Sequence, residues 1–388
     1  MKIAMVFDGL GTGGIERVGV DYAALLQKMG HKIDIYNLKP QYCDMEKNYE
    51  GVDHIYHKKM PMWMLPDQYI LMVKRWWWGK YLYPLCYLFS KCCMMLYRLS
   101  MGKRKKYDLA IAFAGHFTDL NFVSTGFIRA DRRMCWLHGS LMEYLVTAST
   151  YGDQYRKIKN LCVLSEANQS SALSMNRYLQ GLHITHIYNP VNLDSHPCDA
   201  AHVNGLREQY GDFLLMVSRF EEDKDQKSVI RAYKLLKDRG LCRDKLVLAG
   251  DGSTREACMQ LCEELGLTEQ VVFVGNRTDV EDFYTAAKLF IHSSPAEGLP
   301  TVLLEAMKYG TPIVATRSMP GVEEILKGDT FGLQCEVGNP QDIADKIARM
   351  LEDEALRRHY IAQGQIRIQD FSYEKIGQQL EDIVKNLV

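Results

Sequence analysis

The alternation of apolar strands and amphipathic helices along this chain predicts an α/β protein with two doubly wound, Rossmann-like domains. Strands that alternate with helices are typical of parallel sheets, and two separate series of this kind follow one another. The 388 residues are enough for two domains of ordinary size. The composition, with 47% hydrophobic and 24% charged residues, is that of a globular protein.

The first series opens as a strand, a glycine-containing loop and a helix. The helix is predicted over residues 16–29, because Val18, Tyr22 and Leu25 recur on one face. Short apolar runs bounded by turn residues predict the strands of this half. They are residues 3–7, 31–37, 107–113, 133–137, 160–164 and 185–188. We assign residues 1–195 to the first domain.

The second series is more regular. Its predicted strands are residues 213–217, 245–249, 271–274, 289–292 and 313–315. Its predicted helices are residues 226–239, 253–265, 279–287 and 301–309. We assign residues 196–370 to the second domain, and its polar first part is expected to hold the linker and a short helix. In sheets of this kind, ligands bind beyond the carboxyl ends of the strands.

Two glutamates, Glu297 and Glu305, stand at such a strand–loop–helix junction. The loop residues that follow the first glutamate are Gly298, Leu299 and Pro300. A helix that begins at Thr301 directs free backbone N–H groups and about half a positive charge at whatever lies before it, which favours a phosphate. Ionised carboxylates are strong acceptors for sugar hydroxyls. The pattern therefore predicts a nucleotide-sugar site.

The Glu-x7-Glu pair lies in Ser-Pro-x-Glu-Gly-Leu-Pro, and Gly310-Thr311-Pro312 follows it. In this setting it resembles the signature of retaining glycosyltransferases of family 4, which have the GT-B fold. The resemblance covers nearly the whole chain, but it is dense over residues 213–315 and thin over residues 41–106. It implies two Rossmann-like domains that face each other across a cleft. It also implies that a C-terminal helix, residues 371–388, crosses back onto the first domain.

Two cations, Arg219 and Lys224, follow a predicted strand. A guanidinium can grip a diphosphate with its fork, and an ammonium adds a point charge. Acidic neighbours leave a solvated loop as the alternative. Asp223 and Asp225 also match the Asp-x-Asp metal motif of the other glycosyltransferase fold, which we interpret as coincidence. By the resemblance, Arg219 and Lys224 neutralise the leaving diphosphate, so we expect no metal and no other cofactor.

The resemblance also assigns roles to the donor-site residues. Glu297 would hold the hydroxyls of the donor sugar and Glu305 those of the ribose, while the backbone from Gly298 to Thr301 would face sugar and phosphate. The remaining predicted donor contacts are Gly13, Gly14, Gly250, Asn276 and Arg277. Glycine permits the backbone to approach a ligand closely. A plain turn remains the alternative for Asn276 and Arg277.

Two histidines of the first half are candidates for contacts near the transferred sugar. His138 ends a strand in Cys-Trp-Leu-His-Gly, and the family often carries a histidine at this strand end, so we predict a catalytic role. His116 is a weaker candidate for contact with the acceptor. The alternative for each is a structural histidine.

Residues 57–106 differ from the rest of the chain. They hold eleven lysines and arginines but one acidic residue, Asp67, and they are rich in aromatic residues. Aromatic residues favour the membrane interface and basic residues favour anionic lipid. We predict that this segment contacts a membrane surface or a lipid-linked glycan acceptor through Trp76, Trp77, Trp78, Lys103, Arg104, Lys105 and Lys106. The alternative is an insertion whose aromatic residues pack in the first domain's core.

The bulk properties limit the location and the partners. The formal net charge of −1 gives no case for nucleic acid. The eleven cysteines show no framework or zinc spacing, which favours a reducing compartment. We see no signal peptide and no spanning segment, and therefore expect a cytoplasmic protein, peripheral at the inner face of the plasma membrane, as a monomer or homodimer.

We therefore predict a retaining glycosyltransferase that moves a hexose or N-acetylhexosamine from a UDP-linked sugar to a lipid-linked glycan. The expected pathway is capsule, O-antigen or other surface polysaccharide biosynthesis. The departing phosphate oxygen would take the acceptor's proton on the same face. Two alternatives stay open: a nucleotide-sugar epimerase of the same fold, and a membrane-bound scaffold subunit without catalysis. The sequence does not reveal the donor sugar or the acceptor.

Overall fold

The structure is a computed structural model. It describes residues 1–59, 76–100, 105–139, 141, 145, 150–174, 179, 181–194 and 197–387. The chain divides into two compact units: Met1–Pro190 with Gly377–Val388, and Val191–Ile376. The first boundary therefore follows residue 190, five residues before the predicted 195. The C-terminal segment of the first unit begins at residue 377, six residues after the predicted 371.

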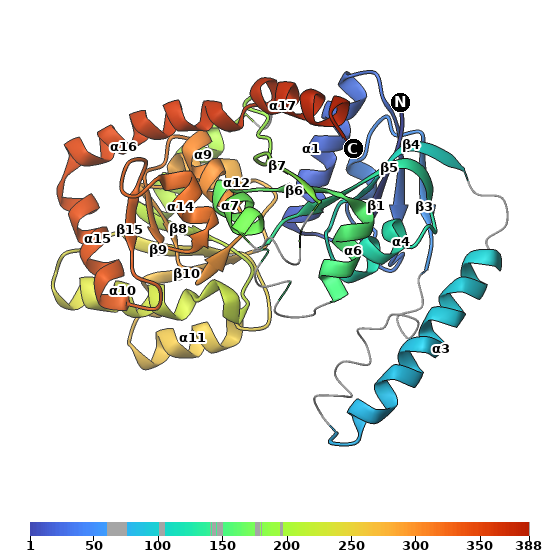
Figure 1. Ribbon diagram of the computed structural model, residues 1–388. Helices are drawn as coiled ribbons and strands as arrows, with labels where there is room; N and C mark the ends of the chain where they lie inside the picture. Colours follow the sequence, from blue (N-terminus) through green and yellow to red (C-terminus); the bar gives the residue numbers. More distant parts are fainter. Residues whose placement is uncertain are drawn as a thin grey trace. The chain divides into compact units, whose positions relative to one another are not determined.

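The first unit contains a seven-stranded sheet in the order β3-β2-β1-β4-β5-β6-β7, and every pairing is parallel (Figure 1). Its strands are β1 (Lys2–Phe7), β2 (Lys32–Asn37), β3 (His54–His57), β4 (Lys106–Ala112), β5 (Arg129–Leu137), β6 (Asn160–Val163) and β7 (His183–His186). The sequence analysis missed β3 because this edge strand, His-Ile-Tyr-His, is only half-buried and has no apolar run.

Helices of the first unit are α1 (Gly14–Lys28), α3 (Gly79–Ser100), α4 (Phe117–Ser124), α6 (Thr150–Ile158) and α7 (Glu166–Ser174), with the short 3₁₀ helix η1 (Glu46–Asn48). Helix α1 packs through Tyr22, whose ring centroid lies 4.2 Å from that of the buried Trp136. The Tyr22 hydroxyl donates a 2.6 Å hydrogen bond to the carbonyl of Tyr188. The helix is thereby fixed to the chain that follows β7 in the same unit.

The second unit contains a six-stranded parallel sheet in the order β10-β9-β8-β11-β13-β15. Its strands are β8 (Phe213–Val217), β9 (Lys245–Ala249), β10 (Val271–Gly275), β11 (Leu289–His292), β13 (Ile313–Thr316) and β15 (Leu333–Cys335). A separate parallel pair joins β12 (Ala296–Glu297) to β14 (Met319–Pro320). The five predicted strands are found, and the sequence analysis missed β15, a strand of three residues.

The second sheet is covered by helices (Figure 1). They are α9 (Ala200–Tyr210), α10 (Gln226–Asp238), α11 (Arg255–Glu264), α12 (Val280–Ala286), α13 (Thr301–Lys308), α14 (Gly321–Leu326), α15 (Pro340–Glu352) and α16 (Glu354–Arg367), with η4 (Glu222–Lys224) and η5 (Ile368–Phe371). Helix α17 (Tyr373–Lys385) begins in this unit, and from Gly377 onward it belongs to the first unit. There a Cβ at Gly377 would lie 3.6 Å from Leu25 of α1, so this part of α17 packs closely on α1.

Both sheets have a topological switch point, where strand order reverses. In the first sheet it lies between β1 and β4, and in the second between β8 and β11. Doubly wound sheets bind ligands beyond the carboxyl ends of the strands at this point. The predicted class of two Rossmann-like domains is confirmed.

Helix α3 forms most of the described part of the basic aromatic segment, residues 57–106, whereas Lys103 and Arg104 lie outside the described residues (Figure 1). Most of its aliphatic and aromatic side chains are exposed, and its buried positions are Gly79, Ser90 and Met94. Of the three tryptophans before the helix, Trp77 is 81% exposed. The alternative of an insertion packed in the core therefore fails for most of this helix. Among the described residues, no helix is long and apolar enough to span a bilayer.

Candidate active site

The two predicted cations lie in the loop after β8, and the second sheet holds that loop in place. Gln226, the first residue of α10, donates hydrogen bonds to the Ser218 hydroxyl at 3.0 Å and to the Arg219 carbonyl at 2.7 Å. The hydroxyl of Ser293, the residue after β11, donates to the Lys224 carbonyl at 2.8 Å. Arg219 is exposed, and its side chain has no ion pair with the described residues.

Lys224 and Glu297 form an ion pair across the switch point of the second sheet. Lys224 Nζ lies 2.7 Å from Glu297 Oε1, and the two side chains are only 16% and 18% exposed. The sequence predicted both residues for the same ligand, 73 positions apart. The structure brings them together because β8 and β11 are neighbours in the sheet.

His292, the last residue of β11, lies beneath this ion pair. Its side chain is 4% exposed, and Nε2 lies 3.5 Å from Glu297 Oε1. Burial favours the neutral acid, but the adjacent His292 imidazole and Lys224 ammonium outweigh it and hold the pKa of Glu297 at about 2. Glu297 is thus ionised at any physiological pH. The sequence analysis did not single out His292, although its place at the end of a buried strand was visible.

The loop between Glu297 and α13 is packed closely from one side. A Cβ at Gly321 would lie 2.5 Å from the carbonyl oxygen of Gly298, so only glycine allows α14 to approach this loop so closely. Helix α13 begins at Thr301 after Pro300, and no side chain caps it. Its first-turn N–H groups carry partial positive charge. Within this helix, Glu305 accepts a 3.0 Å hydrogen bond from the Tyr284 hydroxyl.

The loop after β9 packs directly on the loop that carries Arg219. Gly250 has a φ of 129°, and a Cβ there would lie 2.0 Å from the Ser218 carbonyl oxygen. The backbone N–H of Phe220 donates a 2.9 Å hydrogen bond to the carbonyl of Asp251. Gly250 is thus required for the position of the first cation, whether or not its own backbone contacts a ligand.

The predicted contacts Asn276 and Arg277 follow β10 and are exposed. Arg277 donates to Asp279 from Nε at 2.8 Å and from a terminal nitrogen, and its guanidinium carbon lies 5.3 Å from the centroid of the Phe283 ring. Its hydrogen-bonding groups are therefore partly engaged within its own loop. Its role toward a ligand stays a prediction.

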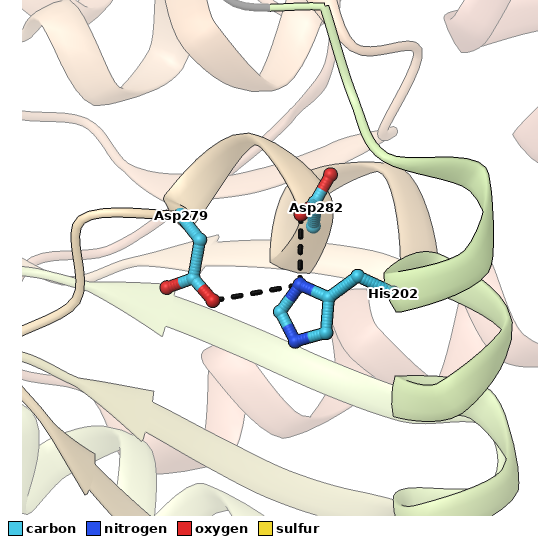
Figure 2. Close-up of side chains that lie close together, drawn as sticks. All are labelled: His202, Asp279 and Asp282. Carbon is cyan, nitrogen blue, oxygen red and sulfur yellow. Dashed lines mark hydrogen bonds and ion pairs between the residues drawn. The ribbon is translucent and has the colours of Figure 1, made fainter.

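Asp279 also lies near His202 and Asp282, the one cluster of potential metal ligands among the described residues (Figure 2). His202 Nδ1 lies 2.8 Å from Asp282 Oδ2 and 3.5 Å from Asp279 Oδ2. Asp282 Oδ1 accepts a hydrogen bond from the Asp199 backbone N–H at 2.7 Å. Arg277 pairs with the Asp279 carboxylate, and the Asp199 N–H occupies one oxygen of Asp282. We therefore interpret the cluster as a structural connection between α9 and α12 and not as a metal site.

Asp225 of the Asp-x-Asp match has a structural place. It precedes α10 with a φ of 48°, and its carboxylate accepts from the Ser228 backbone N–H at 3.3 Å. This is the geometry of a helix N-cap. Lys224, between the two aspartates, instead points its ammonium at Glu297.

His138 of the first unit follows β5 and lies against the chain after β4. Its Nε2 is 2.9 Å from the Phe113 carbonyl oxygen, which makes this nitrogen the donor. Burial lowers the pKa of His138 to about 3, against the effect of that hydrogen bond. The imidazole is therefore neutral, and such a weak base is suited to hydrogen bonding rather than to holding a proton.

His116 stands at the switch point of the first sheet, and its Nδ1 lies 3.5 Å from Asp8 Oδ2. Burial lowers the pKa of His116, but Asp8 and Asp119 outweigh it and raise that pKa above its usual value. Burial raises the pKa of Asp119 to about 7. The pKa of Asp8 falls to about 2, because His116 and Lys39 outweigh its burial. The sequence analysis did not single out either aspartate.

Gly13 and Gly14 open α1, and the first of them is crowded. A Cβ at Gly13 would lie 2.3 Å from Glu16 Oε2, while Gly14 has open space on that side. The Glu16 carboxylate therefore folds back over the start of the helix, which fits its expected structural role near positive partial charge.

The structure thus brings Arg219, Lys224, Glu297 and the start of α13 to one edge of the second sheet, together with His292 and Gly250. Comparisons with known proteins bear on the same region. Residues 202–367 match the family model described as glycosyl transferases, group 1.

Two curated relatives each match a little under half of the chain. The first is N-acetylgalactosamine-N,N'-diacetylbacillosaminyl-diphospho-undecaprenol 4-alpha-N-acetylgalactosaminyltransferase of Campylobacter jejuni. This chain is 30% identical to it over 191 residues, and the match covers 49% of this chain and 50% of the relative. The second is the lipopolysaccharide core biosynthesis glycosyltransferase LpsE of Rhizobium meliloti. This chain is 32% identical to it over 164 residues, and the match covers 42% of this chain and 46% of the relative. The chain thus spans about half the length of these relatives.

A solved structure resembles the chain throughout. HepE of Anabaena, in complex with UDP and glucose, has a TM-score of 0.74 at 20% identity and covers 100% of both chains. Together with the two parallel sheets, this likeness decides the fold. The chain has the GT-B fold. The GT-B prediction is thereby confirmed for the fold.

We predict that Gly250→Ala displaces the loop that carries Arg219. The new methyl group would overlap the Ser218 carbonyl, in addition to the strain of a positive φ. Gly240→Ala is the matched control, because Gly240 has a φ of 69° but open space around it. Thermal unfolding should show a loss of about 1 kcal/mol for the control and clearly more for Gly250→Ala. Equal losses would contradict this packing.

We predict that Glu297 makes the stability of the protein depend on pH in the acid range. A carboxylate whose pKa is lowered by folding stabilises the native state above its unfolded pKa, and this contribution is lost as pH falls from about 4.5 to about 2. Glu297→Gln should therefore lower the melting temperature at pH 7, by an amount that corresponds to about 2 kcal/mol, and by less at pH 3. The exposed Glu269→Gln should show no such trend. A constant difference between wild type and Glu297→Gln would refute the assignment.

Proposed function

We propose that the protein transfers a hexosyl or N-acetylhexosaminyl group from a UDP-linked sugar to a lipid-linked glycan, with retention at the anomeric carbon. The observation that carries this proposal is the Lys224–Glu297 ion pair at the switch point of the second sheet, directly before the uncapped start of α13. Positive groups for a diphosphate and an ionised acceptor for sugar hydroxyls lie there side by side. The matched group 1 family model covers all of these residues.

The geometry supports a simple division of roles toward the donor. Arg219, Lys224 and the first-turn N–H groups of α13 would stabilise the charge that develops on the leaving diphosphate. Glu297, ionised because its pKa is about 2, would accept hydrogen bonds from the sugar and would not donate a proton. Glu305 would accept from the ribose. These cations supply the charge that the reaction needs, so the proposal includes no metal.

In the proposed transfer, the bond between the anomeric carbon and the diphosphate oxygen breaks, and the bond to the acceptor oxygen forms on the same face. The acceptor's proton passes to the departing phosphate oxygen. His138 does not serve as the base, since its pKa of about 3 is too low. His138, His116, Gly13 and Gly14 lie on the first unit, and their contacts with substrate stay predictions.

The choice of substrates has support from the relatives. HepE was solved with UDP and glucose, which favours a UDP-linked donor. The Campylobacter relative is named for a diphospho-undecaprenol acceptor, and LpsE for lipopolysaccharide core biosynthesis. We infer that the acceptor here is also lipid-linked and that the product is a surface glycan.

A lipid-linked acceptor requires access to a membrane, and α3 offers a suitable surface. An exposed apolar face runs along the helix, formed by Tyr81, Leu85, Leu88, Phe89, Leu96 and Leu99. Lys80, Lys91 and Arg98 follow each other at intervals of 11 and 7 residues and therefore form one line along the helix. An apolar face beside a basic line is typical of helices that lie in the membrane interface. We propose that α3 attaches the protein to the inner leaflet.

The predicted lysines beyond α3 are less available for lipid. Lys105 Nζ lies 3.2 Å from Asp34 Oδ2, and Lys106 Nζ lies 2.8 Å from Asp131 Oδ1. The proposed contact therefore rests on α3 and on the tryptophans before it, where Trp76 and Trp78 stack at 5.0 Å.

A panel of UDP- and GDP-sugars with a lipid-diphosphate acceptor extract tests the activity. We expect released nucleotide and glycosylated lipid with one donor. Glu297→Ala should reduce both by about a hundredfold or more, because it removes a preorganised charge from the site. The exposed Glu269→Ala is the control and should transfer at the wild-type rate.

Other outcomes would overturn the proposal. An altered sugar without released nucleotide would indicate the epimerase. No reaction of any donor would favour the scaffold subunit. Near-normal transfer by Glu297→Ala would refute the site.

Sedimentation with vesicles tests the attachment. We expect the protein to bind vesicles that contain phosphatidylglycerol. Leu85→Glu and Leu88→Glu should each weaken binding about tenfold or more. Each variant removes a leucine that would be buried in the lipid and places a negative charge in the membrane interface. Leu241→Glu changes a leucine of the second unit that is 36% exposed and should bind as wild type does. Equal effects of the three variants would contradict attachment through α3.

A further inference from the structure

A cavity of about 520 Å³ lies in the first unit among α3, α4 and α6. Its volume is within the range of small-ligand sites. None of the residues assigned to sugar transfer lines it, and all of its lining residues belong to the first unit. The cavity is therefore a separate site that the proposed reaction does not use.

The lining of this cavity includes three cationic residues: Lys91 and Arg98 from α3, and Lys157 from α6. Burial and the charge of Lys91 lower the pKa of Lys157, although Asp153 raises it, so the charges of the two lysines act on each other across this lining. The acidic residue in the lining, Asp153, is ion-paired with Arg156. Arg98 donates one hydrogen bond, to the Thr125 carbonyl at 3.0 Å, and its fork has further donors. Such a set of cations favours a phosphate.

The rest of the lining is mostly apolar. Met94 and Phe127 are buried in the core of the unit and form part of the wall, and the exposed Met95 completes it on α3. A polar pair, Gln154 and Asn121, is joined by a 2.9 Å hydrogen bond in the same lining. A free phosphate would use the cations and leave the apolar wall unused. A phosphate with a hydrocarbon attached would use both.

The position of the cavity relative to α3 indicates where such a ligand comes from. Lys91 and Arg98 belong to the basic line of α3, which runs beside its exposed apolar face. A lipid with its chains alongside that face would have its head group at the level of these cations.

We propose that this cavity binds the head group of one anionic phospholipid, with its phosphate between Lys91, Arg98 and Lys157 and its first chain carbons against Met94, Met95 and Phe127. Such a site would give the enzyme a preference for acidic membrane lipid beyond the nonspecific attraction of basic residues. It does not depend on sugar transfer, so binding can be measured without any donor or acceptor.

The test is titration calorimetry of the full chain with dihexanoyl-phosphatidylglycerol below its micelle concentration. As a monomer, this lipid offers no membrane surface. We expect one molecule to bind per chain. Lys91→Gln and Lys157→Gln should each weaken binding about fivefold, because each removes one of the three cations proposed to hold the phosphate. Lys80→Gln is the matched control, because Lys80 lies on the same line of α3 but outside the cavity, and it should bind as wild type does.

Three results would overturn the proposal. Equal binding of dihexanoyl-phosphatidylcholine would show that the cations do not select an anionic head group. Full competition by millimolar inorganic phosphate would indicate a phosphate site without a lipid. Equal weakening by Lys80→Gln would indicate general charge attraction. Because no sugar is present, each of these results leaves the proposed transfer reaction untouched.

Discussion

The candidate site depends on one constraint, which is that β8 and β11 lie side by side in the second sheet. In a parallel sheet, all carboxyl ends meet at one edge, and the order reverses between these two strands. The loop after β8 brings Lys224 and the loop after β11 brings Glu297. Their 2.7 Å ion pair joins the two loops. If the strands were not adjacent, Lys224 would not lie beside Glu297 before α13.

The same edge shows how a loop-built site becomes rigid. Each loop is fixed by its neighbour's backbone: Gly250 fits against Ser218, and Gly321 fits against Gly298. The Ser293 hydroxyl donates to the Lys224 carbonyl and so ties the end of β11 to the cation loop. Charged groups that must meet a diphosphate are therefore held in place by packing and hydrogen bonds, which is the preorganisation that electrostatic catalysis requires.

The switch point of the first sheet has a different electrostatic character. Two aspartates near His116 have pKa values pushed apart: that of Asp8 falls to about 2 and that of Asp119 rises to about 7. Burial and the charge of Asp8 outweigh the opposing effect of His116 and explain the second, and the partners His116 and Lys39 explain the first. Such separation is often found where proton positions matter. The first unit thus carries ionisable groups at its strand ends and, along α3, an exposed apolar surface.

The sequence by itself determined the two strand–helix series and the residues of the donor motif. Short apolar runs and loops with glycine or proline specify strands and turns through neighbouring residues alone. Residues 213–217 and 245–249 were predicted with the bounds of β8 and β9. Only the tertiary structure decided which of these residues meet. It paired Lys224 with Glu297 and buried His292 against the same carboxylate. It also left the apolar face of α3 uncovered. Contacts between distant positions depend on strand order and on packing, which local patterns do not encode.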